Sequence, residues 1–562
     1  MSISILSSPY AAALGACVFF YFVIYPIVTY FRDVNGTFHP AHVMLVDRCL
    51  AAAISTCDLE LMLTDSGLRR YPSFHPLAGF SNIPFMILAH TGARSTHLEK
   101  LHRKHPVLRT GPNSLSYGDV RAIKDIYGHN TPCTKDGAYV ITAGSHYHLA
   151  DVVDKHDHAR KRKTLSSAYA IKNLEGWEHK VADKTQRLIK HIDKCCTAPL
   201  APGALPKPED INLDYRKWTN FFTLDAIADI GLSEKLGFLD QGTSMVTGRR
   251  TDGTTYQCDL RPALYQTARK QSLLIWPYQW YSTINKLVDI LPFYRRMSNY
   301  SKEWDGIPNE LAHRRLQRYR AGEKSDDFFQ ALMEDKNGSP NNLEWGEIVA
   351  EVSIMMNAGS ATTAIAIANA TLQLIKHPEC MRKLREEIDA ALEDNEDVDE
   401  TGVIAYDTVK HLPYLRACLD ESLRLFTPTP HGLPRETPSD GANILGDYIP
   451  GGVSVAMSAH VAHRQESVFP QADQYIPERW LGEEGKALQP YFLSFSAGAR
   501  GCIGRNISYL EQTVVLASLL RRYEFALKTP DWDIERLETM NWILGEMPVK
   551  VWRRERKSAL SG

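Results

Sequence analysis

One segment of the sequence combines glycines, an arginine and a cysteine in a spacing that suits the binding of a large flat ligand. Residues 495–504 read Phe-Ser-Ala-Gly-Ala-Arg-Gly-Cys-Ile-Gly, and an apolar stretch of helical character follows them. Cys502 therefore stands where a loop becomes a helix, and the free N–H groups and dipole of a helix amino terminus stabilise an anion and lower the pKa of a thiol. Gly498 and Gly504 let the backbone pass close to a flat ligand, whose carboxylate Arg500 can bind. A buried structural cysteine is the alternative that this segment by itself leaves open.

The pattern Phe-x-x-Gly-x-Arg-x-Cys-x-Gly resembles the heme-binding loop of the cytochrome P-450 monooxygenases. The resemblance implies that Cys502 is the axial thiolate ligand of a heme iron, and that Phe495, Gly498, Arg500 and Gly504 belong to the same heme site. An axial thiolate pushes electron density onto the iron and favours cleavage of the O–O bond. Within the family the chain looks closest to microsomal enzymes of filamentous fungi, with a weaker likeness to benzoate para-hydroxylases.

Two further motifs resemble the family in its expected order, and the resemblance covers residues 70–553. Glu421-Ser-Leu-Arg424 is similar to the family's Glu-x-x-Arg motif. On a helix the two charged residues share one face, because they stand three residues apart. Taken alone, this tetrapeptide indicates only an exposed helical ion pair. Arg479, in the sequence Pro-Glu-Arg-Trp, is similar to the arginine that completes the family's Glu–Arg–Arg cluster. The resemblance implies a structural role for the three residues, which would hold the region of the heme loop.

Residues 342–376 contain no proline and predict one helix of about 50 Å at a rise of about 1.5 Å per residue. The helix includes a run of small residues, Ala-Gly-Ser-Ala-Thr-Thr, at positions 358–363. The Thr362 hydroxyl could bond to the carbonyl of Ala358 four residues earlier and open a notch in the helix. Close helix packing is the alternative explanation for the small residues. The resemblance implies that this run is the oxygen-binding groove of the family's I helix, with Thr362 and Ser360 as catalytic hydroxyls.

Position 361 departs from the family pattern, because Ala361 stands where an aspartate or glutamate is usual. In the family that acid helps to relay protons during oxygen activation. Without it, protons would travel through Thr362, Ser360 and water, which predicts slow and leaky oxygenation. The other interpretation is a reaction that needs less proton delivery.

A basic stretch near residues 155–163 has two interpretations beyond a plain solvated helix. Two His-x-His pairs, at 146/148 and 156/158, could suggest a metal site, but the cations beside the second pair disfavour a divalent ion. The resemblance instead implies that His158, Arg162 and Arg435 bind the heme propionates. The remaining basic residues would then form a cationic face on the cysteine side of the heme, where an acidic reductase could dock.

Charge and composition exclude several classes of protein. The chain of 562 residues carries 64 Lys and Arg and 66 Asp and Glu, so its net charge is −2, which argues against a nucleic-acid binder. No two glycines stand two residues apart, so the sequence contains no Gly-x-Gly-x-x-Gly nucleotide-binding loop. A redox enzyme of this kind would receive electrons from NADPH through a separate protein. The resemblance names NADPH-cytochrome P-450 reductase as that partner, with cytochrome b5 as an additional candidate.

The amino-terminal region predicts a membrane anchor. Residues 10–31 are uncharged, long enough to cross a bilayer of about 30 Å as a helix, and followed by Arg32. This favours one transmembrane helix with residues 1–9 outside the cytosol, and a cleaved signal peptide is the alternative. Residues 32–69 form a linker or an atypical insertion, and residues 70–562 form the catalytic domain. We therefore expect a single-pass protein of the endoplasmic reticulum membrane whose catalytic domain is cytosolic.

The helical periodicity of the chain predicts one large, mainly α-helical domain with minor β-structure. The resemblance implies the cytochrome P-450 fold, with the heme between the I helix and the L helix. The expected activity is insertion of one atom of O2 into an apolar small molecule, by hydroxylation or epoxidation, in fungal secondary metabolism. Three alternatives stay open: a heme-thiolate isomerase, dehydratase or oxidative-coupling enzyme without net oxygenation, a hydroxylase of xenobiotics or aromatic acids, and a noncatalytic heme- or sterol-binding protein.

Overall fold

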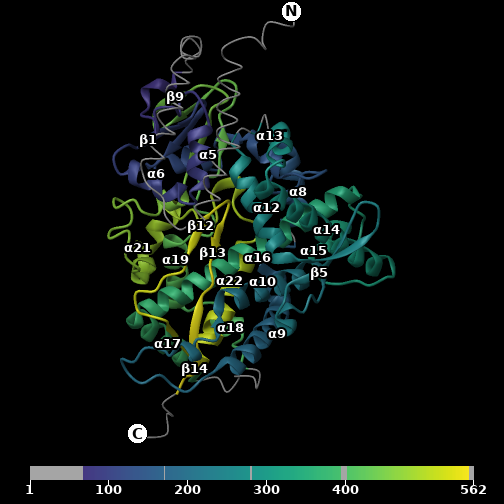
Figure 1. Cartoon of the computed structure of the whole chain (residues 1–562), viewed down its shortest axis with the longest axis vertical. Helices are drawn as coiled ribbons and strands as arrows, with labels where there is room; N and C mark the ends of the chain where they lie inside the picture. The colour runs from purple at the N-terminus through teal and green to yellow at the C-terminus, as the bar shows by residue number, and fades with distance from the viewer. Residues whose placement is uncertain are drawn as a thin grey trace, which may run out of the picture.

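The fold is taken from a computed structural model that describes residues 67–166, 168–169, 171–276, 278, 281–393 and 402–555. The expected anchor over 10–31 and nearly all of the segment over 32–69 lie outside the described residues. Within the described part helices dominate, and the strands form small sheets (Figure 1). The prediction of a mainly α-helical domain with minor β-structure is confirmed.

A single long helix, α16 (Trp345–Lys376), runs through the middle of the molecule (Figure 1). Its sequence is rich in alanine and isoleucine, and it ends just before Pro378, as expected for the restricted residue that precedes a proline. In the described part of the chain it is the one helix long and apolar enough to cross a membrane, but much of its apolar stretch is buried inside the protein. It is therefore a core helix. The prediction of one helix over 342–376 is confirmed from residue 345 onward.

The other helices surround α16. Those in contact with it include α10, α14, α19 and α22. Their bounds, in chain order, are α5 (Ile83–His90), α6 (Arg94–His102), α7 (Ala122–Tyr127), α8 (Lys155–Ser166), α9 (Ile171–Cys195), α10 (Tyr215–Leu232), α11 (Phe238–Gln241), α12 (Leu260–Leu274), α13 (Tyr281–Val288), α14 (Pro292–Arg320), α15 (Phe328–Met333), α17 (Pro378–Glu393), α18 (Tyr406–Val409), α19 (Pro413–Leu425), α20 (Ala459–Ala462), α21 (Gly482–Leu488) and α22 (Arg505–Arg522).

A five-stranded sheet with the order β1-β2-β10-β7-β3 lies at one end of the molecule. In this sheet β10 runs parallel to β2, and the other neighbours are antiparallel. The register of β3 on β7 pairs Lys135 with Arg435, so two cations from distant parts of the chain become neighbours. The strands are β1 (Val107–Gly111), β2 (Ser114–Tyr117), β3 (Thr134–Lys135), β7 (Arg435–Glu436) and β10 (Ser454–Met457).

Smaller sheets complete the fold. The strands β11, β14 and β4 form one sheet, and three antiparallel hairpins pair β5 with β6, β8 with β9, and β12 with β13. These strands are β4 (Leu213–Asp214), β5 (Met245–Arg249), β6 (Thr255–Asp259), β8 (Ala442–Ile444), β9 (Asp447–Ile449), β11 (Tyr523–Leu527), β12 (Arg536–Glu538), β13 (Trp542–Leu544) and β14 (Pro548–Arg553).

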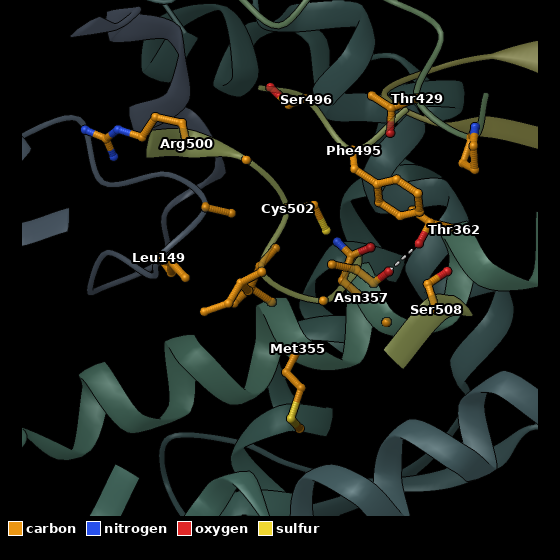
Figure 2. Close-up of a pocket in the computed structure, with 18 of the residues that line it drawn as sticks. Leu149, Met355, Asn357, Thr362, Thr429, Phe495, Ser496, Arg500, Cys502 and Ser508 are labelled. Atoms are coloured by element: carbon orange, nitrogen blue, oxygen red, sulfur yellow. Dashed lines mark hydrogen bonds between the residues drawn. The ribbon is translucent and has the colours of Figure 1, made fainter. Parts of the chain in front are cut away.

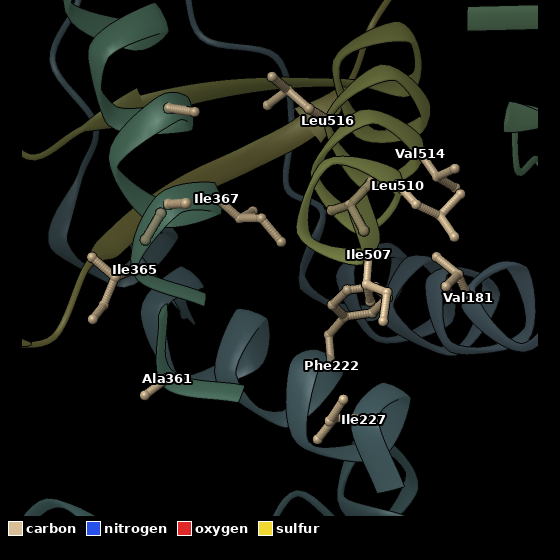
Figure 3. Close-up of a cluster of buried hydrophobic side chains, with 14 of the residues drawn as sticks. Val181, Phe222, Ile227, Ala361, Ile365, Ile367, Ile507, Leu510, Val514 and Leu516 are labelled. Carbon is tan, nitrogen blue, oxygen red and sulfur yellow. The ribbon is translucent and has the colours of Figure 1, made fainter. Parts of the chain in front are cut away.

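The main hydrophobic core fixes α16 against α10 and α22. Phe222 of α10, Ile365 of α16 and Leu510 of α22 are fully buried members of one cluster (Figure 3). Removing a buried leucine or phenylalanine side chain from such a core costs about 2–5 kcal/mol. This packing matters for function, because α16 and the start of α22 lie on two sides of the cavity described next.

Candidate functional site

A cavity of about 430 Å³ separates α16 from the loop that precedes α22 (Figure 2). Its volume falls within the range of about 300–1,000 Å³ that is typical of small-molecule sites. Its lining includes α8, α16, the segment between α19 and β7, the turn between β12 and β13, and the loop over residues 493–504. The cysteine loop, the small-residue run and the predicted propionate-binding residues thus converge on one cavity.

Cys502 lies in the cavity wall, at the end of a tightly folded loop. Its N–H donates to the carbonyl of Phe495 over 2.8 Å, and the N–H of Gly501 donates to the carbonyl of Gly498 over 3.0 Å. Gly498 has a φ of 66°, and a Cβ at this position would collide with the carbonyl oxygen of Tyr127. Glycine is therefore required here, and the loop directs the Cys502 thiol into the cavity (Figure 2).

The pKa of Cys502 differs from the sequence expectation. Burial raises the pKa of this thiol, and the N–H of Gly504 together with the positive charge of Arg162 offsets only part of the effect. The helix amino terminus alone therefore does not produce a thiolate in this chain. A bound metal cation would favour the thiolate form of Cys502, because a thiol that coordinates a metal is deprotonated outright. The site thus fits a thiol whose ionised form depends on its ligand.

The opposite wall is a notch in α16. The Thr362 hydroxyl donates to the carbonyl of Ala358 over 2.7 Å, as the sequence analysis expected, and both residues line the cavity (Figure 2). At Gly359 a Cβ would press against the side chain of Ile227, so close packing also requires a glycine there. The side chain of Asn357 also lines the cavity (Figure 2). Its polarity gives this wall a second hydrogen-bonding group.

Ser360 and Ala361 do not face the cavity. Ser360 is fully buried, and its hydroxyl donates to the carbonyl of Met356 over 2.7 Å. Ala361 is 3% exposed and belongs to the main hydrophobic core (Figure 3). Of the two hydroxyls expected to act in catalysis, only that of Thr362 is in place. The structure also shows that position 361 is packed as apolar core.

Four predicted basic side chains line the cavity, namely those of His158, Arg162, Arg435 and Arg500. The arginines donate hydrogen bonds to backbone carbonyls, such as that of Gly501 (2.6 Å from Arg162), and among the described residues none of them forms an ion pair with a carboxylate. Burial and neighbouring arginines lower the pKa of Arg500 to about 10 and that of His158 to about 3. The three arginines are therefore unneutralised cations, suited to a ligand that carries carboxylates. The His158 imidazole is neutral at neutral pH.

Lys135 joins this group and was missed by the sequence analysis. Its ammonium donates to the carbonyls of Leu149 (3.2 Å) and Ala150 (2.7 Å), and burial, followed by the charges of Arg500 and Arg435, lowers its pKa to about 6. The only signal for it is the pairing of β3 with β7, which no local pattern reveals. Together with the cavity and the thiol, this group of basic side chains, in which the three arginines carry the charge, fits the heme that the resemblance implies.

The histidine pairs do not form a metal site. His146 bonds to Glu344 and His148 pairs with Asp151, whereas His158 faces the cavity. The described residues contain no group of three or more potential metal ligands. The metal interpretation of the two His-x-His pairs is therefore not supported.

A buried ion cluster lies beside the cysteine loop. Arg424 binds both carboxylate oxygens of Glu421 at 2.8 Å, and Arg479 Nε approaches Glu421 Oε1 at 3.1 Å. Arg424 also donates to the carbonyl of His463 over 2.7 Å, and the imidazole of His463 accepts from the N–H of Leu493 over 2.8 Å. The cluster is thus connected by hydrogen bonds to the start of the cysteine loop, which explains how it can hold that loop in place.

Comparison with known proteins agrees with the resemblance to cytochrome P-450 monooxygenases. The family model of cytochrome P450 matches residues 79–551. The cytochrome P-450 monooxygenase atr2 of Stereocaulon alpinum is 31% identical over 82% of this chain and 87% of that protein. The cytochrome P-450 monooxygenase astJ of Aspergillus oryzae is 29% identical over 82% and 88%, respectively. The benzoate 4-monooxygenase bphA of Aspergillus niger is 27% identical over 80% and 87%.

Proposed function

The chain belongs to the cytochrome P-450 family of heme-thiolate monooxygenases, and we propose that it hydroxylates or epoxidises a small, largely apolar molecule in fungal secondary metabolism. The observation that carries the proposal is the position of the Cys502 thiol in a cavity opposite the Thr362 notch. The mostly apolar lining supports an apolar substrate.

The heme supplies the chemistry of oxygen activation, and this chain supplies its binding site. Cys502 is positioned to ligate the iron from the loop side of the cavity. Arg162, Arg435 and Arg500 are positioned to bind the heme carboxylates, because their side chains line the same cavity without carboxylate partners among the described residues. Those carboxylates would offset the burial and the repulsion between arginines that together lower the pKa of Arg500.

Proton delivery depends on α16. The Thr362 hydroxyl donates a hydrogen bond to the Ala358 carbonyl, so the lone pairs of its oxygen are free to accept a hydrogen bond from water in the notch. The Asn357 amide, which also lines the cavity, offers a further hydrogen-bonding group for water. Because Ala361 carries no acid and Ser360 is turned away, protons reach the notch through cavity water and the Thr362 hydroxyl.

The missing acid favours a second candidate, a heme-thiolate isomerase, dehydratase or oxidative-coupling enzyme. An isomerase or dehydratase that acts on a peroxide would need less proton delivery than oxygenation. Turnover of substrate without NADPH and O2 would distinguish an isomerase or dehydratase from a monooxygenase. The kinship with benzoate 4-monooxygenase makes aromatic acids a further substrate class to include in the assay.

Electrons would come from NADPH through NADPH-cytochrome P-450 reductase, with cytochrome b5 as an additional donor. Lys155, Lys163 and Arg505 are exposed and belong to the elements that flank the cysteine loop, which suits an acidic partner. The apolar residues 10–31 support a single-pass anchor in the endoplasmic reticulum membrane, with the catalytic domain in the cytosol.

The proposal is tested by expressing the full chain with a reductase and comparing metabolite profiles with those of the Cys502→Ser variant. We expect products heavier than their precursors by one oxygen atom, formed only with NADPH and O2 and only by the unmodified chain. A product formed without either co-substrate would support the second candidate instead.

A further inference from the structure

His431 lies in the segment between α19 and β7, lines the cavity and is 4% exposed. Neither of its ring nitrogens has a hydrogen-bond partner among the described residues. The carbonyl of Met540 lies near the ring, but outside hydrogen-bonding geometry. A buried polar group without a partner costs free energy, so this arrangement calls for an explanation.

Two other buried histidines among the described residues are fully bonded. His463 bonds the Arg424 carbonyl at 2.9 Å and the Leu493 N–H at 2.8 Å. His102 bonds the His105 carbonyl and the Ser116 hydroxyl, each at 2.9 Å. In these two residues the fold satisfies both nitrogens of a buried imidazole. His431 differs because its open side is the cavity.

Two further polar side chains lie in the same part of the cavity wall. Thr429, two residues before His431, donates through its hydroxyl to Asn541 Oδ1 over 2.7 Å, and both residues line the cavity. Because the amide oxygen of Asn541 accepts this bond, its N–H2 group is left to donate elsewhere. Much of the nearby wall is apolar, including Leu433, Met457 and Met540. A polar spot is thus set into an apolar surface, as in sites that orient a ligand.

The charge of this spot limits the chemistry of its ligand. Burial, aided by the charge of Arg94, lowers the pKa of His431 to about 3, so the imidazole is neutral at neutral pH. The Arg94 guanidinium is paired with Glu538 at 3.0 Å, so it already has a carboxylate partner within the protein. A neutral imidazole offers one N–H donor and one acceptor nitrogen. It therefore suits a carbonyl or hydroxyl oxygen better than a carboxylate, whose burial would require a cationic partner.

We propose that His431 is a specificity-determining anchor that hydrogen-bonds a neutral oxygen, a carbonyl or hydroxyl, of the substrate. The proposal rests on the proposed function, since it assigns the substrate class of the same cavity. The apolar remainder of the substrate then packs against the apolar lining. The substrate is accordingly an already oxygenated molecule, so the reaction that supplies it must leave a ketone, an ester or a hydroxyl group in place.

The first test uses the unmodified heme-loaded protein and two probes of nearly equal shape. Acetophenone carries a carbonyl where α-methylstyrene carries a CH2 group, and the naphthalene analogues of both provide a larger pair. Binding is measured by the shift of the heme absorption and, independently, by ligand-observed NMR. We expect each ketone to bind about three- to tenfold more tightly than its hydrocarbon partner, the net worth of one hydrogen bond. Equal affinities, or no binding of either ketone, would overturn the proposal.

Variants then locate the preference. His431→Phe should abolish it by weakening ketone binding alone, and His431→Gln, which keeps a donor and an acceptor, should retain part of it. Met457→Leu, a change elsewhere in the apolar lining, should shift both probes alike and serves as the matched control. If His431→Phe leaves the preference for the ketone intact, the imidazole does not bind the substrate oxygen and the proposal is wrong.

Failure of the anchor and failure of the proposed function give different results. A ketone preference without any oxygenated product would retain the anchor and remove the monooxygenase proposal. Oxygenated products without a ketone preference would retain the monooxygenase proposal and remove the role proposed for His431.

Discussion

Two buried polar regions of this protein have opposite designs. In the Glu421–Arg424–Arg479 cluster, the carboxylate of Glu421 accepts bonds from both arginines, from the Trp480 indole and from the N–H of Ile476. In the wall of the cavity, His431 makes no hydrogen bond with the described residues. The first region is a closed network that fixes the fold, and the second leaves polar groups open to a ligand.

Two histidines make the contrast sharper. Burial lowers the pKa of both His463 and His431 to about 3, so both are neutral at physiological pH. His463 uses both ring nitrogens inside the protein, between Arg424 and Leu493. Burial and pKa therefore do not distinguish these two histidines, whereas their hydrogen bonds do.

The largest effect is expected at the closed network. Glu421→Ala would leave Arg424 and Arg479 buried without their carboxylate, and breaking a buried ion pair costs about 3–5 kcal/mol. We expect this variant to lose most of its stability and its heme content, measured by chemical denaturation and by the heme absorption of the purified protein. Wild-type stability of Glu421→Ala would show that the network is not structural.

A smaller loss is expected where the I-helix acid is missing. Ala361→Asp places a carboxyl group at a site that is 3% exposed and surrounded by core, which costs at least about 2 kcal/mol in unfolding free energy. Ala361→Ser is the control, because its hydroxyl can bond to a carbonyl of its own helix. An Ala361→Asp protein of undiminished stability that formed more product per NADPH would contradict the apolar environment described for this position.

The third prediction concerns pH. His463 has an ordinary pKa of 6.5 when unfolded and about 3 when folded, so between these values the unfolded chain binds the extra proton. Stability should therefore fall on acidification below pH 6.5, by up to about 1.4 kcal/mol per pH unit from this residue. In His463→Gln the stability is lower at neutral pH, but its slope against pH should be shallower. Equal slopes in denaturation series would mean that His463 is not held neutral.

The smallest effect is expected at an exposed charge pair. Arg382 of α17 contacts Glu379 and Glu386 on the helix surface, the same residue types as in the buried cluster. Water screens such pairs, so Arg382→Ala should leave the denaturation midpoint unchanged within error. A loss comparable to that of Glu421→Ala would remove the distinction between the two kinds of ion pair.

The sequence predicted the parts of the site that are formed by short contiguous segments. The loop around Cys502 and the small-residue run ending at Thr363 are short motifs, so their spacing alone indicated a loop before a helix and a notch within one. Lys135 and Asn541 were missed, because strand pairing and a distant hairpin bring them to the cavity. The orientation of Ser360 also escaped prediction, since its side chain could have pointed either way until the packing of α16 was known.

The central claim is that the Cys502 sulfur binds the heme iron, and the carbon-monoxide difference spectrum of the reduced protein tests it most directly. We expect the unmodified chain and Cys380→Ser, whose thiol lies on α17, to show the absorption band at the wavelength that gives the family its name. Cys502→Ser should lack that band completely. A Cys502→Ser protein that keeps the band would show that another group holds the iron.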